Sequence, residues 1–291
     1  MSVSDETLAD LRSAVASCVA GPVEAAKPIQ VARFESIPVA ASAPVAAALP
    51  VVPAAAPRVV VVPAVLSPAI PAPPKVELPA GDKATRWAAL QEKVLNDKFG
   101  LAQVQPGKKI VFGTGSLDAK IFFCGDTPGE EEELAGEPFV GPAGQLLTRM
   151  IQGMGVKREQ VYIGYSMNWR PEVPVGPGGV PGASRRPTAQ EMAYCRPYLQ
   201  AQIEIVQPDL IVALGATAAG GFLGADSFKT LGEVKGRWHE FGGRPLIVTY
   251  HPSYILQNNT NRSKRGIWED LMKVMERVGL PVSEKQRQFY L

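Results

Sequence analysis

The chain has few cysteines and histidines. Its 291 residues include three cysteines, Cys18, Cys124 and Cys195, with no CxxC pair, and two histidines. This scatter fits a reducing compartment and argues against a disulfide framework or a self-contained metal site. The chain also lacks a GxGxxG string and a Walker-type lysine, so neither common nucleotide-binding loop is indicated.

The N-terminal part indicates neither a secretion signal nor a membrane helix. The first residues contain no basic stretch followed by an apolar one. The apolar segment 51–70 is interrupted by four prolines and carries Arg58, which disfavours a bilayer helix. We therefore expect a soluble, cytoplasmic protein. The net charge of +2 does not by itself indicate a nucleic-acid partner.

Alanine, proline and valine are concentrated in one part of the chain. They make up 41 of the 60 residues in 21–80, a composition typical of a semi-rigid, disordered linker. Residues 1–20 have apolar residues at helical spacing, which predicts a short amphipathic helix that either docks a protein partner or binds nothing. Residues 81–281 have the length of one domain, and 282–291 are predicted to form a tail.

Strand-like and helix-like stretches alternate within that domain. Helices are predicted over 84–95, 143–154, 188–206, 216–223 and 264–278, with Thr188 and Glu191 spaced as a capping box. Strands are predicted over 119–124, 160–165, 209–214 and 246–250. This alternation predicts an α/β fold with three layers, α/β/α, around a central, mostly parallel four-stranded sheet.

Unusual residues follow all four predicted strands. They are Asp126 with an acidic run at 130–133, the segment 166–171, the string 215–217, and His251 with its neighbours. Because parallel strands end at one edge of a sheet, these loops are expected to converge on one crevice that carries a carboxylate, an imidazole and aromatic surface. The general richness of such loops in Gly, Pro and Asp explains any one of them, but all four less well.

At these loops the chain resembles the family 4 uracil-DNA glycosylases, the iron–sulphur enzymes of thermophiles. The similarity runs from about residue 119 to 278, and its ordered motifs are Gly-Asp-Thr-Pro-Gly at 125–129, Gly-Glu-Pro-Phe-Val-Gly at 136–141, Cys-Arg-Pro-Tyr-Leu at 195–199, Ile-Val-Ala-Leu-Gly at 211–215, Gly-Arg-Trp-His at 236–239 and Tyr-His-Pro-Ser-Tyr at 250–254. The resemblance implies a DNA repair glycosylase that hydrolyses the N-glycosidic bond of uracil, or of a related deaminated base, flipped out of DNA.

The resemblance also implies side-chain roles, each of which has a simpler alternative. Phe139 would stack on the flipped base, or be a core aromatic. His251 would donate to a base carbonyl, or cap or pack. Asp126 would position the attacking water, or bind amides in its own turn. Glu132 would assist, or belong to a solvated acidic run.

Further residues complete the implied site. Gly125, Tyr165 and Asn168 would contact the base. The implied DNA-binding residues are Pro252, Ser253, Tyr254, Ile255, Leu256, Arg262, Lys264 and Arg265. Ile255 or Leu256 would be the wedge in the minor groove, and the basic residues would bind phosphates, although an ordinary basic helix entry explains them too. Residues 183–186 either contact DNA or form a loop.

The chain departs from its relatives at three places. The relatives hold a four-iron cluster with four cysteines, whereas here no cysteine lies between Lys83 and Phe123, Trp169 stands at the third ligand position, and Cys195 alone is left. We therefore predict no metal and no cofactor, with Trp169 and its neighbours filling the space. Asp126 replaces the usual Glu, and Tyr165 replaces an Asn whose amide pairs with the uracil edge.

Three hypotheses follow. The first is a monomeric glycosylase that acts on DNA without a cofactor. The second is a catalytically silent DNA-binding homologue that recruits partners through its N-terminal tether; Tyr165 and the missing cluster favour it, whereas His251, Phe139 and Asp126 oppose it. The third is a nucleotide- or phosphate-binding enzyme on a similar sheet, for which Gly215 opens a suitable loop.

Overall fold

The structure is a computed structural model that describes residues 70–171, 184–224 and 226–291. A six-stranded sheet lies at the centre of its fold. The strand order is β1-β3-β2-β4-β6-β5. The four central strands pair in parallel: β2 (Ile121–Gly125), β3 (Tyr162–Tyr165), β4 (Leu210–Leu214) and β6 (Arg244–Thr249). The predicted α/β class and parallel centre are confirmed. The predicted helix at 1–20 and most of the predicted linker lie outside the described residues.

The predicted number of four strands is wrong, because two antiparallel strands flank the parallel ones. They are β1 (Thr114–Gly115), which pairs with β3, and β5 (Trp238–Phe241), which pairs with β6. β1 has two residues and no hydrophobic pattern, so its sequence carries no strand signal. β5 could have been found, because Gly242 and Gly243 both have positive φ, +57° and +76°, in a two-residue hairpin turn.

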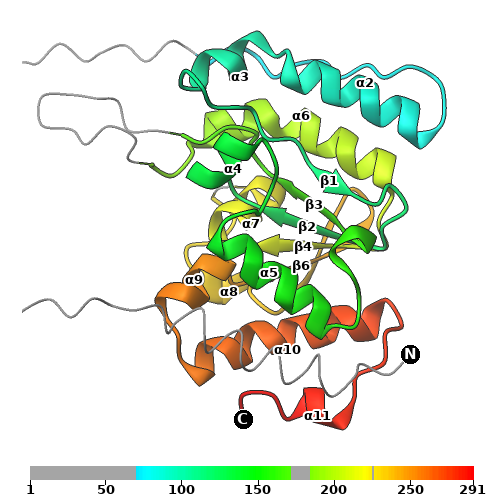
Figure 1. The fold of residues 1–291 in the computed structure, drawn as a ribbon, viewed down its shortest axis with the longest axis vertical. Helices are drawn as coiled ribbons and strands as arrows, with labels where there is room; N and C mark the ends of the chain where they lie inside the picture. The colour runs from blue at the N-terminus through cyan, green and yellow to red at the C-terminus, as the bar shows by residue number, and fades with distance from the viewer. Residues whose placement is uncertain (1–69, 172–183, 225) are drawn as a thin grey trace, which may run out of the picture. The chain divides into compact units, whose positions relative to one another are not determined.

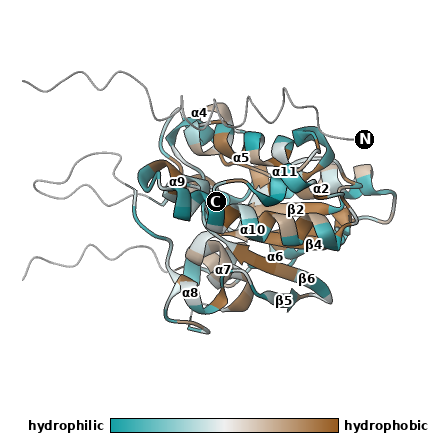
Figure 2. Ribbon diagram, turned by 90° about the horizontal axis from the view of Figure 1, so that it is seen from below, coloured by the Kyte–Doolittle hydropathy of each residue, from teal (hydrophilic) through white to brown (hydrophobic). Residues whose placement is uncertain are grey.

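The two faces of the sheet are covered by different helices (Figure 1). Ile121 and Phe123 point to the face packed by α5 (Pro142–Gly153), α9 (Pro252–Gln257) and α10 (Asn261–Arg277). The intervening Phe122 and Cys124 point to the face packed by α6 (Ala189–Val206), α7 (Gly215–Leu223) and α8 (Leu231–Val234). This alternation gives β2 a continuous apolar sequence, as expected for a strand buried on both faces. Figure 2 shows β2, β4 and β6 largely in hydrophobic colours, with the hydrophilic colours mostly on helices and loops around them.

Local sequence signals place the helix ends. In the capping box of α6, the Thr188 hydroxyl accepts from the Glu191 N–H at 3.2 Å, and the Glu191 carboxylate accepts from the Thr188 N–H at 2.7 Å. All five predicted helices are present, within a few residues of the expected bounds. α2 (Lys83–Leu95) and α3 (Lys98–Gln103) lie on the outer side of α6 (Figure 1). No helix of the described segments is both long and apolar enough to cross a membrane.

Both ends of the described chain pack against the domain. Ile70, Val76 and Leu78, from the last part of the predicted linker, contact the cluster under α2 and α6. At the other end, α11 (Glu284–Arg287) belongs to the predicted tail. The Trp268 indole N–H donates to the Gln286 carbonyl at 2.7 Å, and Phe289 is 1% exposed.

We expect Phe289→Ala to lower the free energy of unfolding by about 3 kcal/mol or more, because it removes a fully buried ring and leaves a cavity. Leu291→Ala is the matched control, since Leu291 is 82% exposed and its removal should have little effect. Urea denaturation of the two variants tests this. Equal stabilities would show that the C-terminal residues do not contribute to the core.

Candidate active site

A cleft of about 500 Å³ opens at the carboxyl ends of the parallel strands. Its lining comes from the loops after all four of them, together with the loop before α5: residues 126–132, Phe139, residues 141–143, Tyr165, residues 215–217, His251 and Ser253, with Arg170, Ser184 and Arg186 on the remaining side. The predicted convergence of four strand ends on one crevice is therefore found. The cleft lining also includes Ser184 and Arg186, from the segment 183–186.

The Glu132 carboxylate joins two of these loops. One oxygen accepts from the N–H of Gly129 at 3.0 Å, and the other accepts from those of Val140 at 3.0 Å and Gly141 at 2.9 Å. Glu132 is 5% exposed, on α4 (Glu130–Ala135). Hydrogen bonds from backbone amides to a buried carboxylate are strong. Because all its bonds go to backbone amides, we regard Glu132 as a positioning residue.

The loop that Glu132 holds places Phe139 in a left-handed conformation. Phe139 has φ +53°, a rare value for a residue with a side chain. Its own N–H donates to the Tyr165 hydroxyl at 3.0 Å, and Arg158 donates to the Pro138 carbonyl at 2.6 Å. These contacts, with those of Glu132, hold the Phe139 ring at the floor of the cleft, where it is 3% exposed.

The end of β2 is fixed by β3. The Ser166 hydroxyl and N–H both donate to the Gly125 carbonyl, at 2.8 and 3.0 Å, and the Met167 N–H donates to the Asp126 carbonyl at 3.1 Å. The Asp126 side chain is 35% exposed, and its carboxylate accepts no hydrogen bond from a described residue. The alternative role of Asp126, binding amides in its own turn, is thus not seen in the described residues.

His251 lies opposite Asp126, with its Nε2 at 3.8 Å from Oδ1. Its Nδ1 accepts from the Ser253 N–H at 3.2 Å and lies 2.7 Å from the Ser253 hydroxyl, so His251 caps α9. Burial lowers the pKa of His251, against the opposing effect of Asp126 and Glu132. With Nδ1 an acceptor and the ring neutral, the proton is on Nε2. That buried Nε2 has no hydrogen-bond partner among the described residues, so it is a donor directed into the cleft.

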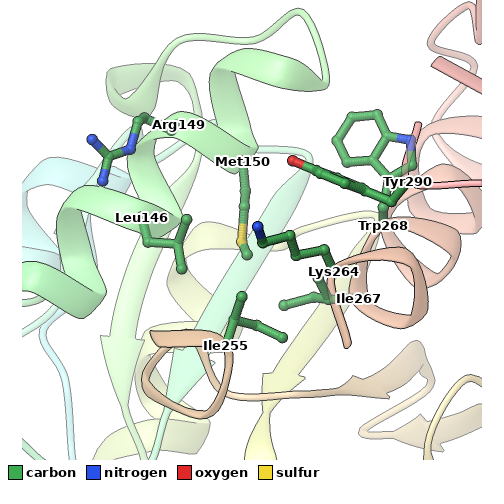
Figure 3. A pocket seen from close by; sticks show the side chains of 8 residues that line it. All are labelled: Leu146, Arg149, Met150, Ile255, Lys264, Ile267, Trp268 and Tyr290. Carbon is green, nitrogen blue, oxygen red and sulfur yellow. The ribbon is translucent and has the colours of Figure 1, made fainter. Parts of the chain in front are cut away.

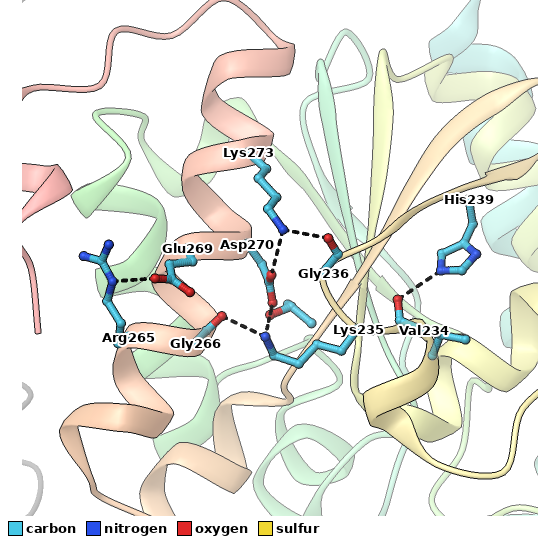
Figure 4. Close-up of polar contacts among 10 residues, drawn as sticks. Val234, Lys235, Gly236, His239, Arg265, Gly266, Glu269, Asp270 and Lys273 are labelled. Atoms are coloured by element: carbon cyan, nitrogen blue, oxygen red, sulfur yellow. Dashed lines mark hydrogen bonds and ion pairs between the residues drawn. The ribbon is translucent and has the colours of Figure 1, made fainter. Parts of the chain in front are cut away.

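Two features behind His251 fix its position. Gly215 has φ +90°, and a Cβ there would lie 3.1 Å from the Cβ of His251, so a glycine lets the two loops approach. Two residues before His251, the Thr249 hydroxyl donates to the buried Asp270 at 2.7 Å. Lys235 binds the same Asp270 oxygen at 2.7 Å and the Gly266 carbonyl at 2.9 Å (Figure 4). The end of β6 is therefore anchored to α10.

Of the other residues predicted to contact the base, Gly125 lies beside the rings of the cleft floor and Asn168 lies outside the cleft lining. Gly125 lies against both rings, since a Cβ there would be 2.6 Å from the Phe139 ring and 2.8 Å from that of Tyr165. Asn168 is absent from the cleft lining: it is 3% exposed, and its amide donates to the Val111 carbonyl at 3.0 Å. Tyr165 lines the cleft and Asn168, three residues after the end of β3, does not.

The acidic run is only partly the solvated stretch that its composition suggests: Glu130 and Glu131 are exposed, whereas Glu132 and Glu133 are buried. Glu133 is 3% exposed and pairs with Arg170 at 3.0 Å and with Lys108. Together with Glu132 it forms the inner face of α4, and both carboxylates are compensated by donors. Sequence reasoning missed the Glu133–Arg170 pair. The signal available was the position of Arg170, in the loop after the neighbouring strand.

The predicted DNA-binding residues have varied surroundings. Ile255 is 2% exposed and points with Lys264 into a small apolar cavity of about 20 Å³ (Figure 3). Burial lowers the pKa of Lys264. Arg265 donates to Glu269 and to the carbonyls of Arg287 and Phe289. Those with outward-facing side chains are Tyr254, 39% exposed, and Arg262. The other three are Pro252, which is buried, Ser253, which bonds His251, and Leu256, which packs against the core.

Fold and cleft together define an α/β protein of the doubly wound kind, whose cleft presents a histidine N–H, a carboxylate and an aromatic floor at the strand ends. Residues 112–272 match the family model described as the Uracil DNA glycosylase superfamily. The chain belongs to this superfamily, and the resemblance expected from the motifs is confirmed.

Several curated relatives agree with this assignment. The chain is 43% identical over 165 residues to the Type-4 uracil-DNA glycosylase of Thermotoga maritima, covering 56% of this chain and 80% of that protein. It is 39% identical over 150 residues to that of Archaeoglobus fulgidus, covering 50% and 70%. It is 36% identical over 176 residues to that of Saccharolobus solfataricus, covering 58% and 76%.

The residues present do not fit the four-iron cluster that the resemblance implies. Trp169, at the third ligand position, is 2% exposed and lies edge-on to Phe99 at 5.9 Å and to Tyr194 at 6.1 Å between ring centroids. Burial raises the pKa of the Cys195 thiol, so the thiolate that iron needs is disfavoured. Within the described residues, no group of three or more His, Cys, Asp or Glu could hold a metal ion.

We expect Trp169→Ala to lower the free energy of unfolding by about 3–5 kcal/mol, because the indole fills the space between α3 and α6. Trp169→Phe is the matched control: it keeps a ring, and the indole N–H that it loses has no partner among the described residues. Thermal unfolding with iron analysis of the purified chain tests both points. Stoichiometric iron, or equal melting of the Ala variant and the wild type, would contradict this role for Trp169.

Proposed function

We propose that this chain is a monofunctional DNA glycosylase that hydrolyses the N-glycosidic bond of uracil, or of a related deaminated base, flipped out of DNA. Its family and the names of its relatives support the DNA glycosylase class. The observation that carries the proposal is the facing pair in the cleft, a buried, unpartnered His251 Nε2 at 3.8 Å from the Asp126 carboxylate.

His251 supplies the donor for the departing base. When the C1′–N1 bond breaks, its electron pair moves onto the base and gathers on the carbonyl oxygens. A neutral imidazole whose N–H is already directed at that carbonyl stabilises the developing charge without reorganisation. Ser253 keeps Nδ1 in the acceptor role, so it is a positioning residue for His251.

Asp126 acts on the sugar side. Its carboxylate stabilises the positive character that develops at C1′ and accepts the proton of the water that attacks there. Its exposed fraction of 35% leaves it accessible to that water. Phe139 forms the floor on which the base is held, and Glu132 maintains the loop that carries Phe139.

DNA is the macromolecular partner that this reaction requires. On α9 we propose Tyr254 as the residue that enters the groove, in preference to the buried Ile255, because Tyr254 is exposed and stacked on Tyr250 at 4.6 Å. Arg262, and Arg186 at the mouth of the cleft, are the proposed phosphate contacts. A protein partner for residues 1–20, the monomeric state and a cytoplasmic location remain predictions.

A base-release assay tests the function. The full chain is mixed with labelled single- and double-stranded oligonucleotides carrying uracil, hypoxanthine or xanthine. We expect release from at least one of them, and a loss of about 100-fold or more in His251→Ala, because a donor aimed at a developing charge is removed.

His239→Ala is the matched control for that assay. His239 is the other histidine, lies on β5 outside the cleft lining, and its Nε2 lies 3.0 Å from the Val234 carbonyl. Release that is equally fast in the His251 and His239 variants would exclude His251 as the donor. No release from any oligonucleotide, with DNA still bound, would support the silent homologue.

A further inference from the structure

The floor of the cleft is already occupied by a ring of the protein itself. Tyr165 stacks on Phe139, with ring centroids 4.9 Å apart and an angle of 20° between the planes. His251 lies beside the same Phe139 ring, with centroids 5.7 Å apart and planes inclined at 32°. With 3% of Phe139 exposed, its ring offers no open face to a ligand from solvent.

The stacked pair is held closed by specific contacts. The Tyr165 hydroxyl oxygen accepts from the Phe139 N–H at 3.0 Å, so the far end of the tyrosine ring is tied to the backbone of the loop on which it stacks. Gly125 closes another side, since even a methyl group there would approach both rings to under 3 Å. A planar base could lie on Phe139 only if the Tyr165 ring moved by the thickness of an aromatic ring.

We propose that Tyr165 is a specificity-determining residue that closes the pyrimidine-binding slot, its ring taking the place on Phe139 that a flipped base would occupy. This rests on the proposed function, in which Phe139 is the floor of the base site. The chain as it stands then binds uracil weakly and releases it slowly, and removal of the ring opens the slot. The Tyr165 phenol also lacks the donor–acceptor pair of an amide, so it does not reproduce paired hydrogen bonds to a uracil edge.

The test compares wild type, Tyr165→Asn and Tyr165→Phe as full chains. The Asn variant removes the ring and supplies an amide, whereas the Phe variant keeps the ring and loses only the hydroxyl. We expect single-turnover uracil release to rise by about tenfold or more in Tyr165→Asn, since stacking on the floor becomes possible. No comparable gain is expected in Tyr165→Phe. If wild type releases uracil and a folded Tyr165→Asn variant releases it no faster, the proposal is overturned.

Binding of free uracil, followed by ligand-observed NMR, separates this proposal from the proposed function. Binding to Tyr165→Asn but not to wild type supports slot closure even if neither chain releases a base, and in that case only the glycosylase proposal fails. Binding to wild type as tight as to Tyr165→Asn overturns slot closure. If melting curves show that Tyr165→Asn does not fold, binding of free uracil to wild type alone decides the test. Uracil binding to wild type then overturns slot closure, and no binding of uracil to wild type supports it.

Discussion

The hydrogen bonds accepted by the Glu132 carboxylate are the constraint on which the cleft depends. They reach from the loop after β2 to the loop before α5, two segments that the sheet does not hold together. Without them, the amides of Val140 and Gly141 would lose their acceptor. The left-handed backbone conformation of Phe139 would then be less stabilised. In the proposed function, the ring that holds the base is therefore kept in place by a residue that touches no reacting atom.

A second aspect of the site is that two large aromatic side chains stand where the resemblance leads one to expect smaller, polar or metal-binding ones. Trp169 occupies a position of the implied cluster, and Tyr165 occupies the position of the base-reading amide. Both rings are at most 4% exposed and stack or pack edge-on against other rings. The same physical solution, apolar filling of a buried volume, serves stability at Trp169 and, in our proposal, substrate choice at Tyr165.

The parallel centre of the fold and the convergence of its loops could be predicted from sequence because both follow from local patterns. Uniformly apolar strands such as β4 indicate burial on both faces, and parallel strands bring Asp126 and His251 to one edge. The sequence alone could not show which side chains in the run of four glutamates are buried, namely those of Glu132 and Glu133. That choice depends on amides and cations from distant loops. Likewise the burial of Ile255 depends on how α9 packs on α5 and α10, which periodicity over six residues does not determine.

A crystal structure of the full chain bound to DNA that carries a non-hydrolysable 2′-fluoro-deoxyuridine, determined for Tyr165→Asn, tests the central claim most directly. That claim is that the cleft is a base pocket with His251 as the donor. The predicted result is a flipped uracil on the Phe139 ring, with a carbonyl oxygen within hydrogen-bonding distance of His251 Nε2 and the sugar facing Asp126. A duplex bound elsewhere, or a flipped base whose carbonyls do not approach His251, would contradict it.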